Sequence, residues 1–234
     1  MIYAETKRGL RVVSYNIRKA RGRDGRRDPS RILNVINALD ADVVALQEAD
    51  RRLGDRSAAL PRALIERETD LDVLDVAAND VSLGWHGNAV LVRKDLSATG
   101  ADRIALPGLE PRGAVRFKLN IDGPMSVVAT HLGLRRRDRV AQLRCLSRVL
   151  SDEPSALIVG DFNEWSRTKG MEPIVDRFHV VTPGASFHSA RPMVSLDRFA
   201  LAGEVMVRAS GVQQNALTRV ASDHLPVWLD LDFG

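Results

Sequence analysis

In the stretch Ala156-Leu157-Ile158-Val159-Gly160-Asp161-Phe162-Asn163, a continuous apolar run ends in a carboxylate and a carboxamide. Such runs are typical of strands that are covered on both faces. Because side chains alternate along an extended chain, Asp161 and Asn163 point to the same side. Asp can take a proton from water, and Asn can hydrogen-bond a charged oxygen without competing for that proton. Asp is also a frequent turn residue, so this stretch alone leaves a structural turn open.

The same design occurs at further places along the chain. Apolar runs lead into Asn16, Glu48, His131 and Asp197, and the segment Ser222-Asp223-His224-Leu225-Pro226 opens the last expected strand. Polar groups at strand ends gather along one rim of a sandwich of two sheets. A set of carboxylates, amides and imidazoles, in a chain with a single cysteine, suits a hard cation with oxygen ligands better than zinc held by thiolates.

Two helices and two more strands are expected between these motifs. Asp28-Pro29 predicts the start of a helix, since apolar residues follow at one-face spacing as far as Leu39. A second helical pattern runs from Asp138 to Leu150. Gly87 to Val92 and Ala114 to Leu119 are predicted strands, joined by a loop rich in Gly and Pro. This alternation indicates an α/β fold with mixed sheets rather than a purely parallel one.

Length and composition set the class of protein. A chain of 234 residues with 44% hydrophobic residues can bury one large core, and residues 1–234 contain no linker or repeat that predicts a second domain. The lone Cys145 excludes an intrachain disulfide and fits a reducing compartment. Met1 to Arg11 holds no apolar stretch of signal-peptide length, and no run reaches the length of a transmembrane segment. We therefore expect a soluble protein of the cytoplasm.

Six motifs resemble, in the same order, those of the endonuclease/exonuclease/phosphatase superfamily. Each motif is a weak match alone, but together they span residues 16 to 227. The resemblance implies a four-layer αββα sandwich of two mixed β-sheets flanked by helices, like deoxyribonuclease I. It also implies hydrolysis of a phosphate ester that depends on Mg²⁺ or Mn²⁺. The motifs are Tyr15-Asn16-Ile17-Arg18, Leu46-Gln47-Glu48, Thr130-His131-Leu132, Gly160-Asp161-Phe162-Asn163, Leu196-Asp197-Arg198 and Ser222-Asp223-His224-Leu225-Pro226-Val227.

The resemblance implies catalytic roles for five residues. Asp161 is the general base that activates the attacking water, and Asn163 orients that water or hydrogen-bonds a phosphoryl oxygen. His224 and His131 lie against the scissile phosphate, and Asp197 orients His224. As imidazolium ions the two histidines would stabilise charge on the phosphoryl oxygens, and one would protonate the leaving group. For Asn163, a structural turn remains the alternative.

Glu48 is the predicted metal ligand. A carboxylate that follows an apolar strand needs a neutralising partner when it is buried, and Mg²⁺ binds through as few as one or two carboxylates. Asn16 would support the metal or its waters, and Asp223 is a further candidate ligand. A salt bridge from Arg51 or Arg52 to Glu48 is the structural alternative.

Three further residues are weaker candidates for contact with the substrate phosphate. Asn88 resembles an asparagine that the family places beside its site, although a turn explains it equally well. Arg112 is either a planar phosphate clamp or a surface arginine. Arg18 stands where abasic-site endonucleases usually carry an acid, and His131 stands where they carry Tyr. Both differences favour the branch of deoxyribonuclease I, sphingomyelinases and inositol-phosphate phosphatases.

Arginine-rich segments bear on the substrate. The formal net charge is +4, and Arg18 to Arg31 and Arg135 to Arg139 follow two of the motif residues. If they flank the site as loops, they would attract a polyanion. The alternative is a solvated surface rich in arginine.

Three functions remain open. A metal-dependent phosphodiesterase of the nuclease type, acting on DNA or another nucleic acid, is slightly favoured because the sequence suggests no exposed apolar membrane anchors. The alternative acts on a phospholipid head group, a sphingomyelin-like lipid or an inositol phosphate, with peripheral contact to an anionic membrane. The third is a catalytically silent binding module, which is disfavoured because every core motif residue is present. The phosphodiester substrate is the implied partner, and no protein partner is implied.

Overall fold

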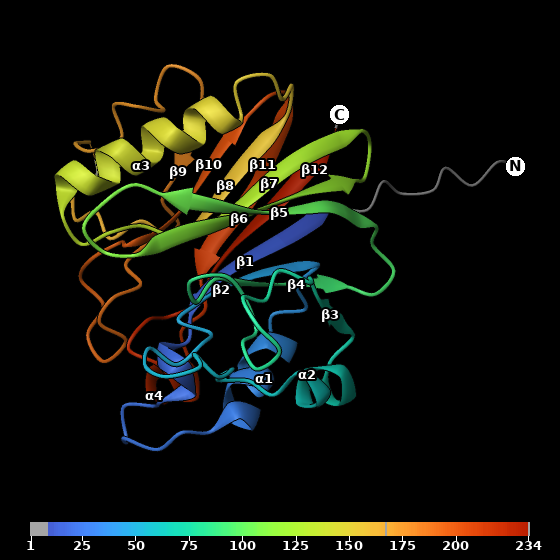
Figure 1. The fold of residues 1–234 in the computed structure, drawn as a ribbon, viewed down its shortest axis with the longest axis vertical. Helices are drawn as coiled ribbons and strands as arrows, with labels where there is room; N and C mark the ends of the chain where they lie inside the picture. Colours follow the sequence, from blue (N-terminus) through green and yellow to red (C-terminus); the bar gives the residue numbers. More distant parts are fainter. Residues whose placement is uncertain (1–8, 167, 234) are drawn as a thin grey trace, which may run out of the picture.

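Two six-stranded mixed sheets lie face to face, with helices on their outer sides (Figure 1). The computed structural model describes residues 9–166 and 168–233, so the expectation for the start of the chain falls mostly outside the described residues. The first sheet has the strand order β11-β12-β1-β2-β4-β3. Its strands are Val205–Val212, Val227–Phe233, Leu10–Asn16, Val43–Gln47, Ala89–Arg93 and Leu71–Val73.

The second sheet has the strand order β5-β6-β7-β8-β10-β9. Its strands are Ala98–Leu106, Arg112–Asn120, Pro124–His131, Ala156–Asp161, Asp197–Ala202 and His179–Val181. The helices are α1 (Pro29–Asn37), α2 (Arg62–Glu68), α3 (Arg136–Val149) and the short α4 (Thr218–Ala221). In Figure 1, α1 and α2 cover the first sheet, and α3 covers the second. The predicted αββα sandwich is confirmed.

Alternation along the strands builds three apolar layers. Val12 and Val127 belong to the layer between the two sheets, where both are fully buried. Val13 follows Val12 in β1 and points to the opposite face of the sheet, where it packs with Ile32 in the layer under α1. Ile158 packs in the layer under α3. Because the central strands are covered on both faces, they read in the sequence as continuous apolar runs.

The two long helices begin and end close to the predicted positions. Asp28 caps α1, since its carboxylate accepts a hydrogen bond from the backbone N–H of Arg31 at 3.0 Å. Pro29 occupies the first helical position, where its missing N–H costs nothing. A cap of this kind stabilises a helix by about 1 kcal/mol. The helices α2 and α4 were not predicted.

Two parallel strand pairs decide where the polar residues meet. β1 and β2 are joined through α1, and β7 and β8 through α3. Their register aligns Asn16 with Gln47 and His131 with Asp161, so the carboxyl ends of these four strands share one rim. β10 runs antiparallel to β8, and Asp197 begins this strand directly opposite Asp161. The expectation that Asp197 follows a strand was wrong, because an antiparallel strand reaches the rim with its first residue.

The loop expected between residues 92 and 114 contains a strand. β5 pairs with β6 from Ala98 to Leu106 at the edge of the second sheet, and most of its residues are exposed. An edge strand with polar side chains lacks the apolar run that identified the central strands. Among the described residues, no helix is long and apolar enough to cross a membrane.

Candidate active site

Asp161 is the centre of a polar cluster on the shared rim. Its side chain is 1% exposed. Its Oδ2 accepts a hydrogen bond from Asn16 Nδ2 at 3.1 Å and lies 3.4 Å from His131 Nε2 and 3.7 Å from His224 Nε2. Its Oδ1 accepts from the backbone N–H of Asn163 at 2.9 Å. Two donors and two imidazoles thus converge on one carboxylate, which fixes its orientation.

Gly160 makes this placement possible. It has a φ of +150°, and a Cβ on it would lie 1.9 Å from the carbonyl oxygen of Thr130 on the neighbouring strand β7. Only glycine fits this close approach of two backbones. The residue before the central carboxylate is therefore required by packing as well as by conformation.

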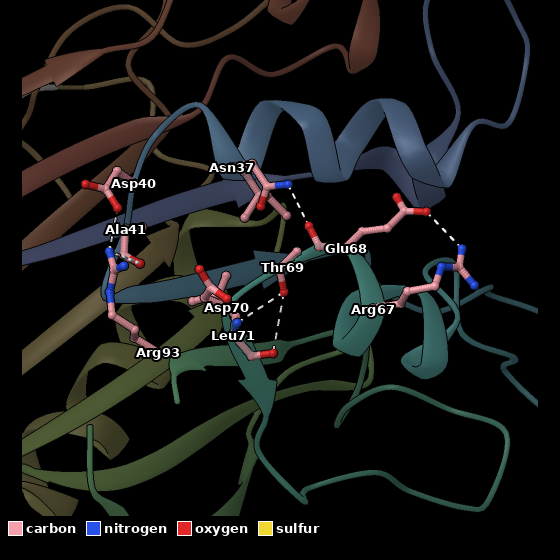
Figure 2. A pocket seen from close by; sticks show the side chains of 10 residues that line it. Asn37, Asp40, Ala41, Arg67, Glu68, Thr69, Asp70, Leu71 and Arg93 are labelled. Atoms are coloured by element: carbon pink, nitrogen blue, oxygen red, sulfur yellow. Dashed lines mark hydrogen bonds and ion pairs between the residues drawn. The ribbon is translucent and has the colours of Figure 1, made fainter. Parts of the chain in front are cut away.

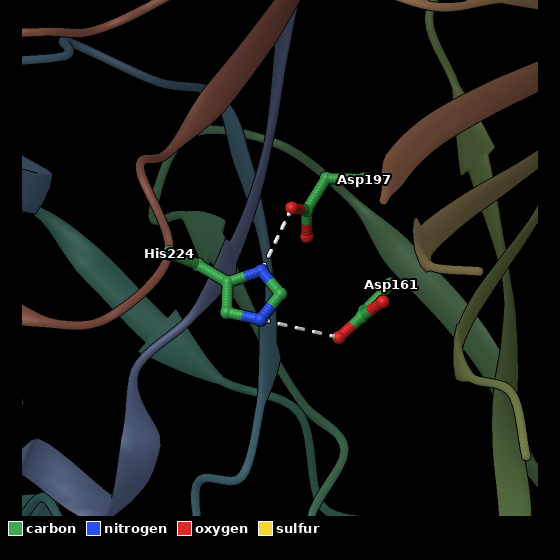
Figure 3. Close-up of side chains that lie close together, drawn as sticks. All are labelled: Asp161, Asp197 and His224. Carbon is green, nitrogen blue, oxygen red and sulfur yellow. Dashed lines mark hydrogen bonds and ion pairs between the residues drawn. The ribbon is translucent and has the colours of Figure 1, made fainter. Parts of the chain in front are cut away.

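Asp197 and His224 form a buried pair beside Asp161 (Figure 3). His224 Nδ1 lies 2.9 Å from Asp197 Oδ2, which also accepts a hydrogen bond from Ser186 Oγ at 2.6 Å. Burial alone would lower the pKa of His224, but the carboxylates of Asp197 and Asp161 raise it to about 10. His224 is therefore an imidazolium ion at neutral pH, with Nε2 facing Asp161.

His131 has the opposite protonation state. Burial lowers its pKa to about 3, and the charge of Asp161 opposes this effect without overcoming it. Arg112 lowers the same pKa further. The expectation that both histidines are imidazolium ions therefore fails for His131, because it lacks the second carboxylate that His224 has. Both rings face the same oxygen of Asp161, but His224 is charged and His131 is neutral.

Glu48 follows β2 at the same rim, and a lysine neutralises it. The ammonium group of Lys19 contacts the carboxylate of Glu48, which is 28% exposed. Burial raises the pKa of Glu48, but the hydrogen bond and charge of Lys19 outweigh it and hold this pKa below its ordinary value. Neither Arg51 nor Arg52, the predicted alternatives, forms the ion pair. Lys19 was not predicted as this partner, since nothing in the surrounding sequence marks it as a partner of Glu48.

A left-handed turn directs Lys19 toward Glu48. Arg18, Lys19 and Ala20 have φ angles of +47°, +57° and +55°, a conformation that costs about 1–2 kcal/mol for each residue with a Cβ. The backbone N–H of Lys19 donates to the carbonyl oxygen of Glu48 at 3.0 Å, which ties the turn to β2. Strain of this kind persists where surrounding structure imposes it, most often at functional sites.

The oxygen donors on this side of the rim fit a hard cation. Asp223 Oδ2 lies 3.3 Å from Arg18 Nε, so this carboxylate, like that of Glu48, faces a positive side chain. Asn16 Oδ1 accepts from the backbone N–H of Arg18 at 3.1 Å. Two carboxylates and an amide oxygen are the ligand types that Mg²⁺ and Mn²⁺ prefer, and here both carboxylates lie beside positively charged side chains.

A second group of potential metal ligands is less suited to a cation. Asp161, Asp197 and His224 offer ligand atoms within 4.8 Å of one another. However, an imidazolium ion has no free lone pair, and each nitrogen of His224 already faces a carboxylate. This trio is therefore held by the hydrogen bond between His224 and Asp197 and by the attraction between His224 and Asp161, rather than arranged as a cation cage.

A pocket of about 390 Å³ opens beside Glu48 and His131. Arg112 lines it and donates to Glu110 at 2.8 Å, so it is an ion-paired, buried arginine at the pocket wall. Asn88 is fully buried and donates to the carbonyl oxygen of Gly113 at 2.9 Å, which places it outside the lining. The lining residues are Lys19, Glu48, Asp50, Arg52, Arg56, His86, Gly87, Glu110, Pro111, Arg112, His131 and Leu134.

Arg56 and His86 are among the lining residues that were not predicted from the sequence. Arg56 Nη1 lies 3.3 Å from His86 Nδ1. Burial and the charges of Arg56 and Arg112 lower the pKa of His86, so the ring is neutral and Nδ1 accepts this hydrogen bond. No motif indicated either residue, because the pair forms only when two loops meet.

A different pocket, of about 320 Å³, lies at the far end of the first sheet (Figure 2). There Arg93 donates to Asp40 at 2.8 Å and to Asp42 at 2.9 Å, just before β2 begins. Since β2 runs from this end toward Glu48, the pocket is separated from the polar cluster by the length of the strand. Its mixed charges are already paired, and we assign it no role.

Several arginines expected in open loops have internal partners. Arg136 and Arg139 bind Glu164 at 2.8 and 2.6 Å. Burial raises the pKa of Glu164, but these two arginines outweigh burial and lower it to about 2. Arg139 is buried, whereas Arg135 and Arg137 remain exposed. The segment begins α3 rather than a loop, so the prediction that Arg135 to Arg139 form a free basic loop was wrong.

Exposed apolar side chains lie next to the site, contrary to the sequence-based expectation. Leu53 is 87% exposed, Leu109 67%, Leu134 62% and Trp165 68%. All four lie in loops that follow or adjoin residues of the cluster or the pocket. Single exposed hydrophobic residues are common, but several around one site point to a contact surface.

Comparisons with known proteins agree with the fold. A model of the Endonuclease/Exonuclease/phosphatase family matches residues 13–224. The uncharacterized protein YbhP of Escherichia coli K12 is 32% identical over 164 residues, and the match spans 62% of this chain and 62% of the relative. The endonuclease/exonuclease/phosphatase of Beutenbergia cavernae has a TM-score of 0.75 at 24% identity, covering 97% of this chain and 72% of its own. Truncated TDP2 of Caenorhabditis elegans has a TM-score of 0.72 at 18% identity, covering 96% and 98%.

Proposed function

Because the chain belongs to the Endonuclease/Exonuclease/phosphatase family, we propose that it hydrolyses phosphodiesters with the help of Mg²⁺ or Mn²⁺. The observation that carries this proposal is the convergence of Asn16, His131 and His224 on Asp161 Oδ2. A buried carboxylate held by donors, with a charged imidazole beside it, supplies a base and a phosphate ligand in one place.

Asp161 acts as the general base. A water between its carboxylate and the phosphorus atom would transfer a proton to Asp161 as its oxygen attacks, which contributes about 10²–10⁴ in rate. Asn163 donates its Nδ2 to the carbonyl oxygen of Leu132 at 2.9 Å. Its Oδ1 can then accept from the same water and orient it.

His224 stabilises the developing negative charge. Its Nε2–H is directed at the site by the bond from Nδ1 to Asp197, and the raised pKa keeps the proton in place. This group binds a phosphoryl oxygen and can protonate the leaving oxygen. The neutral His131 orients Asp161 rather than adding charge.

Glu48 would hold the divalent cation, with Asn16 and Asp223 in support. The bound ion supplies charge neutralisation at the phosphoryl oxygens. Lys19 and Arg18 occupy these carboxylates otherwise and keep them ionised and in place. Arg112 and Arg18 are proposed to contact other oxygens of the substrate phosphate, and Asn88 is proposed to support the wall behind them.

Bis-p-nitrophenyl phosphate and p-nitrophenyl phosphate test this function. We expect hydrolysis of the diester with Mg²⁺ or Mn²⁺, none with EDTA, and weak hydrolysis of the monoester. Asp161→Asn should lower kcat by about 10²-fold or more. The matched control is Asp72→Asn, an exposed carboxylate on β3, which should leave kcat unchanged. Undiminished turnover in Asp161→Asn, or full activity in EDTA, would refute the proposal.

Nucleic acid and a phospholipid head group are the two candidate substrates. The positive net charge favours a nucleic acid. The exposed Leu109, Leu134 and Trp165 beside the pocket favour a lipid. Rates on plasmid DNA, RNA, phosphatidylglycerol vesicles, sphingomyelin and inositol phosphates, measured with one enzyme preparation, would decide between them.

A further inference from the structure

Three loops beside the first turn of α3 carry exposed apolar side chains next to the pocket. We call these side chains the apolar rim and define it as Leu109, Leu134 and Trp165, which are 67%, 62% and 68% exposed. Leu134 also lines the pocket that contains Glu48. Exposed apolar surface of this kind gains free energy when a partner covers it.

Hydrogen bonds hold Leu109 and Leu134 on one surface although they come from different loops. The backbone N–H of Leu109 lies 3.3 Å from Asp138 Oδ2 in the first turn of α3. The backbone N–H of Leu134 donates to Glu110 Oε1 at 3.2 Å, which ties this loop to the neighbour of Leu109. The backbones of the two leucine loops are therefore tied to each other and to the start of the helix.

Trp165 is held at the same place through its neighbour in the chain. Glu164 is buried and binds Arg136 and Arg139, both in α3. Arg139 also donates to the carbonyl oxygen of Leu134 at 2.6 Å. These bonds join the Trp165 loop to the Leu134 loop through one helical turn, so the loops that carry the rim are held together by α3.

The net charge around the rim is positive. The described residues of the three loops and of the first turn of α3 carry six basic and five acidic side chains: Arg135, Arg136, Arg137, Arg139, Lys169 and Arg177 against Glu110, Asp138, Glu164, Glu172 and Asp176. Arg112, the first residue of β6, adds a seventh positive charge, and Glu110, Asp138 and Glu164 each have an arginine within 3.4 Å. Arg137 remains 74% exposed and Arg135 is exposed beside it. The excess positive charge selects an anionic partner.

The chemistry of the rim favours a bilayer over a nucleic acid. Bases stack on flat aromatic or guanidinium faces, and two of the three rim side chains, Leu109 and Leu134, offer no such face. By contrast, aliphatic side chains and a tryptophan bordered by arginines are typical of surfaces that insert at the membrane interface. Arginine side chains at that depth reach the lipid phosphates.

We propose that the apolar rim docks on an anionic phospholipid bilayer, with Leu109, Leu134 and Trp165 among the acyl chains and Arg135 and Arg137 against the phosphates. This placement brings the mouth of the pocket to the head groups, so a head-group phosphodiester reaches Glu48 without leaving the membrane. The choice of substrate rests on the proposed function, whereas the docking itself does not depend on catalysis.

Vesicle sedimentation tests the docking. The wild-type chain should bind vesicles of phosphatidylglycerol and phosphatidylcholine, and bind pure phosphatidylcholine at least tenfold more weakly. The double variant Leu109→Ser/Trp165→Ser should lose at least tenfold in affinity for the anionic vesicles. Met206→Ser is the matched control, since Met206 is 63% exposed on the distant edge strand β11. It should bind like the wild type.

The contribution of the arginines to vesicle binding and the insertion of Trp165 into the bilayer are tested separately. Arg135→Gln/Arg137→Gln should weaken binding by about fivefold per arginine. The control Arg144→Gln/Arg148→Gln removes two exposed arginines from later turns of α3 and should have little effect. Binding should shift the tryptophan fluorescence to shorter wavelength, and Trp165→Phe should abolish the shift while keeping most of the affinity.

Three results would overturn the docking proposal. They are no binding of anionic vesicles by the wild type, equal binding by Leu109→Ser/Trp165→Ser, and equal losses in the two arginine pairs. A rim variant that loses affinity for duplex DNA instead would replace the bilayer by a nucleic acid. Turnover of bis-p-nitrophenyl phosphate should be unchanged in the rim variant. If the wild type binds vesicles but does not hydrolyse this diester, the proposed function fails and the docking stands.

Discussion

Asp197→Asn should convert the activity from nearly independent of pH to strongly dependent on it. Asp197 contributes a full charge and a 2.9 Å hydrogen bond to the pair that raises the pKa of His224 to about 10. Asparagine has the same shape and no charge. Burial and Asp161 remain, and their effects on His224 oppose each other. In His131 burial outweighs Asp161, so we expect the pKa of His224 in this variant to fall to the free-histidine value of about 6.5 or lower.

The size of the effect follows from the fraction of imidazolium. At pH 8.5 a group with a pKa of about 10 is almost fully protonated, whereas one with a pKa of about 6.5 or lower is about 1% protonated or less. Asp197→Asn should therefore lose about 10²-fold or more in kcat at pH 8.5, and this loss should shrink about tenfold per pH unit as the pH falls toward the lowered pKa.

The assay is kcat on bis-p-nitrophenyl phosphate from pH 6 to 9 at saturating Mn²⁺. Ser186→Ala is the control, because it removes the 2.6 Å hydrogen bond to Asp197 and leaves the carboxylate in place. It should lower the rate slightly without changing the pH profile. A loss in Asp197→Asn that is the same at every pH would show that Asp197 positions His224 without controlling its charge.

Three further predictions concern the metal site, the packing of β8 and the histidines. Glu48→Gln should raise the Mg²⁺ concentration for half-maximal activity at least about tenfold; an unchanged requirement would exclude Glu48 as the ligand. Gly160→Ala should lower the free energy of unfolding in urea by about 3 kcal/mol, since its Cβ would meet Thr130, whereas Gly100→Ala, which meets nothing within 4 Å, should lose about 1 kcal/mol or less. The free energy of unfolding should be greatest near pH 6.5. Because the pKa of His131 is lowered, the stability that its buried neutral form contributes is lost as the pH falls. Because the pKa of His224 is raised, the stability that its charged form contributes is lost as the pH rises toward about 10. Unfolding midpoints in His131→Gln should depend less on pH between 5 and 6.5, and an identical slope would contradict this origin.

The residues that could be predicted from the sequence follow long apolar runs. Asn16, His131 and Asp161 end buried strands, and the register of parallel neighbours brings such ends together whatever the rest of the chain does. Asp197 was placed in the correct cluster by its motif but at the wrong end of its strand. Apolar periodicity does not distinguish the beginning of an antiparallel strand from the end of a parallel one.

The parts that could not be predicted depend on tertiary contacts. Lys19 reaches Glu48 through a left-handed turn without glycine, and local preferences predict the opposite conformation. Arg139 and Glu164 are buried together, although each residue type is normally exposed when considered alone. The exposed Leu109 is an ordinary loop residue in the sequence. Its importance comes from the neighbours that folding brings to it.

The pairing of β1 with β12 has a consequence for how the chain folds. Leu10 lies opposite Leu231, so β1 lacks one of its two neighbours in the sheet until β12 has been synthesised. His224 also enters the chain late, after the other residues of the cluster. A ribosome-bound chain that still lacks these residues therefore carries Glu48 and Asp161 but not His224, the proposed phosphate ligand. For the proposed hydrolysis, this order would keep the growing chain inactive until β12 is in place.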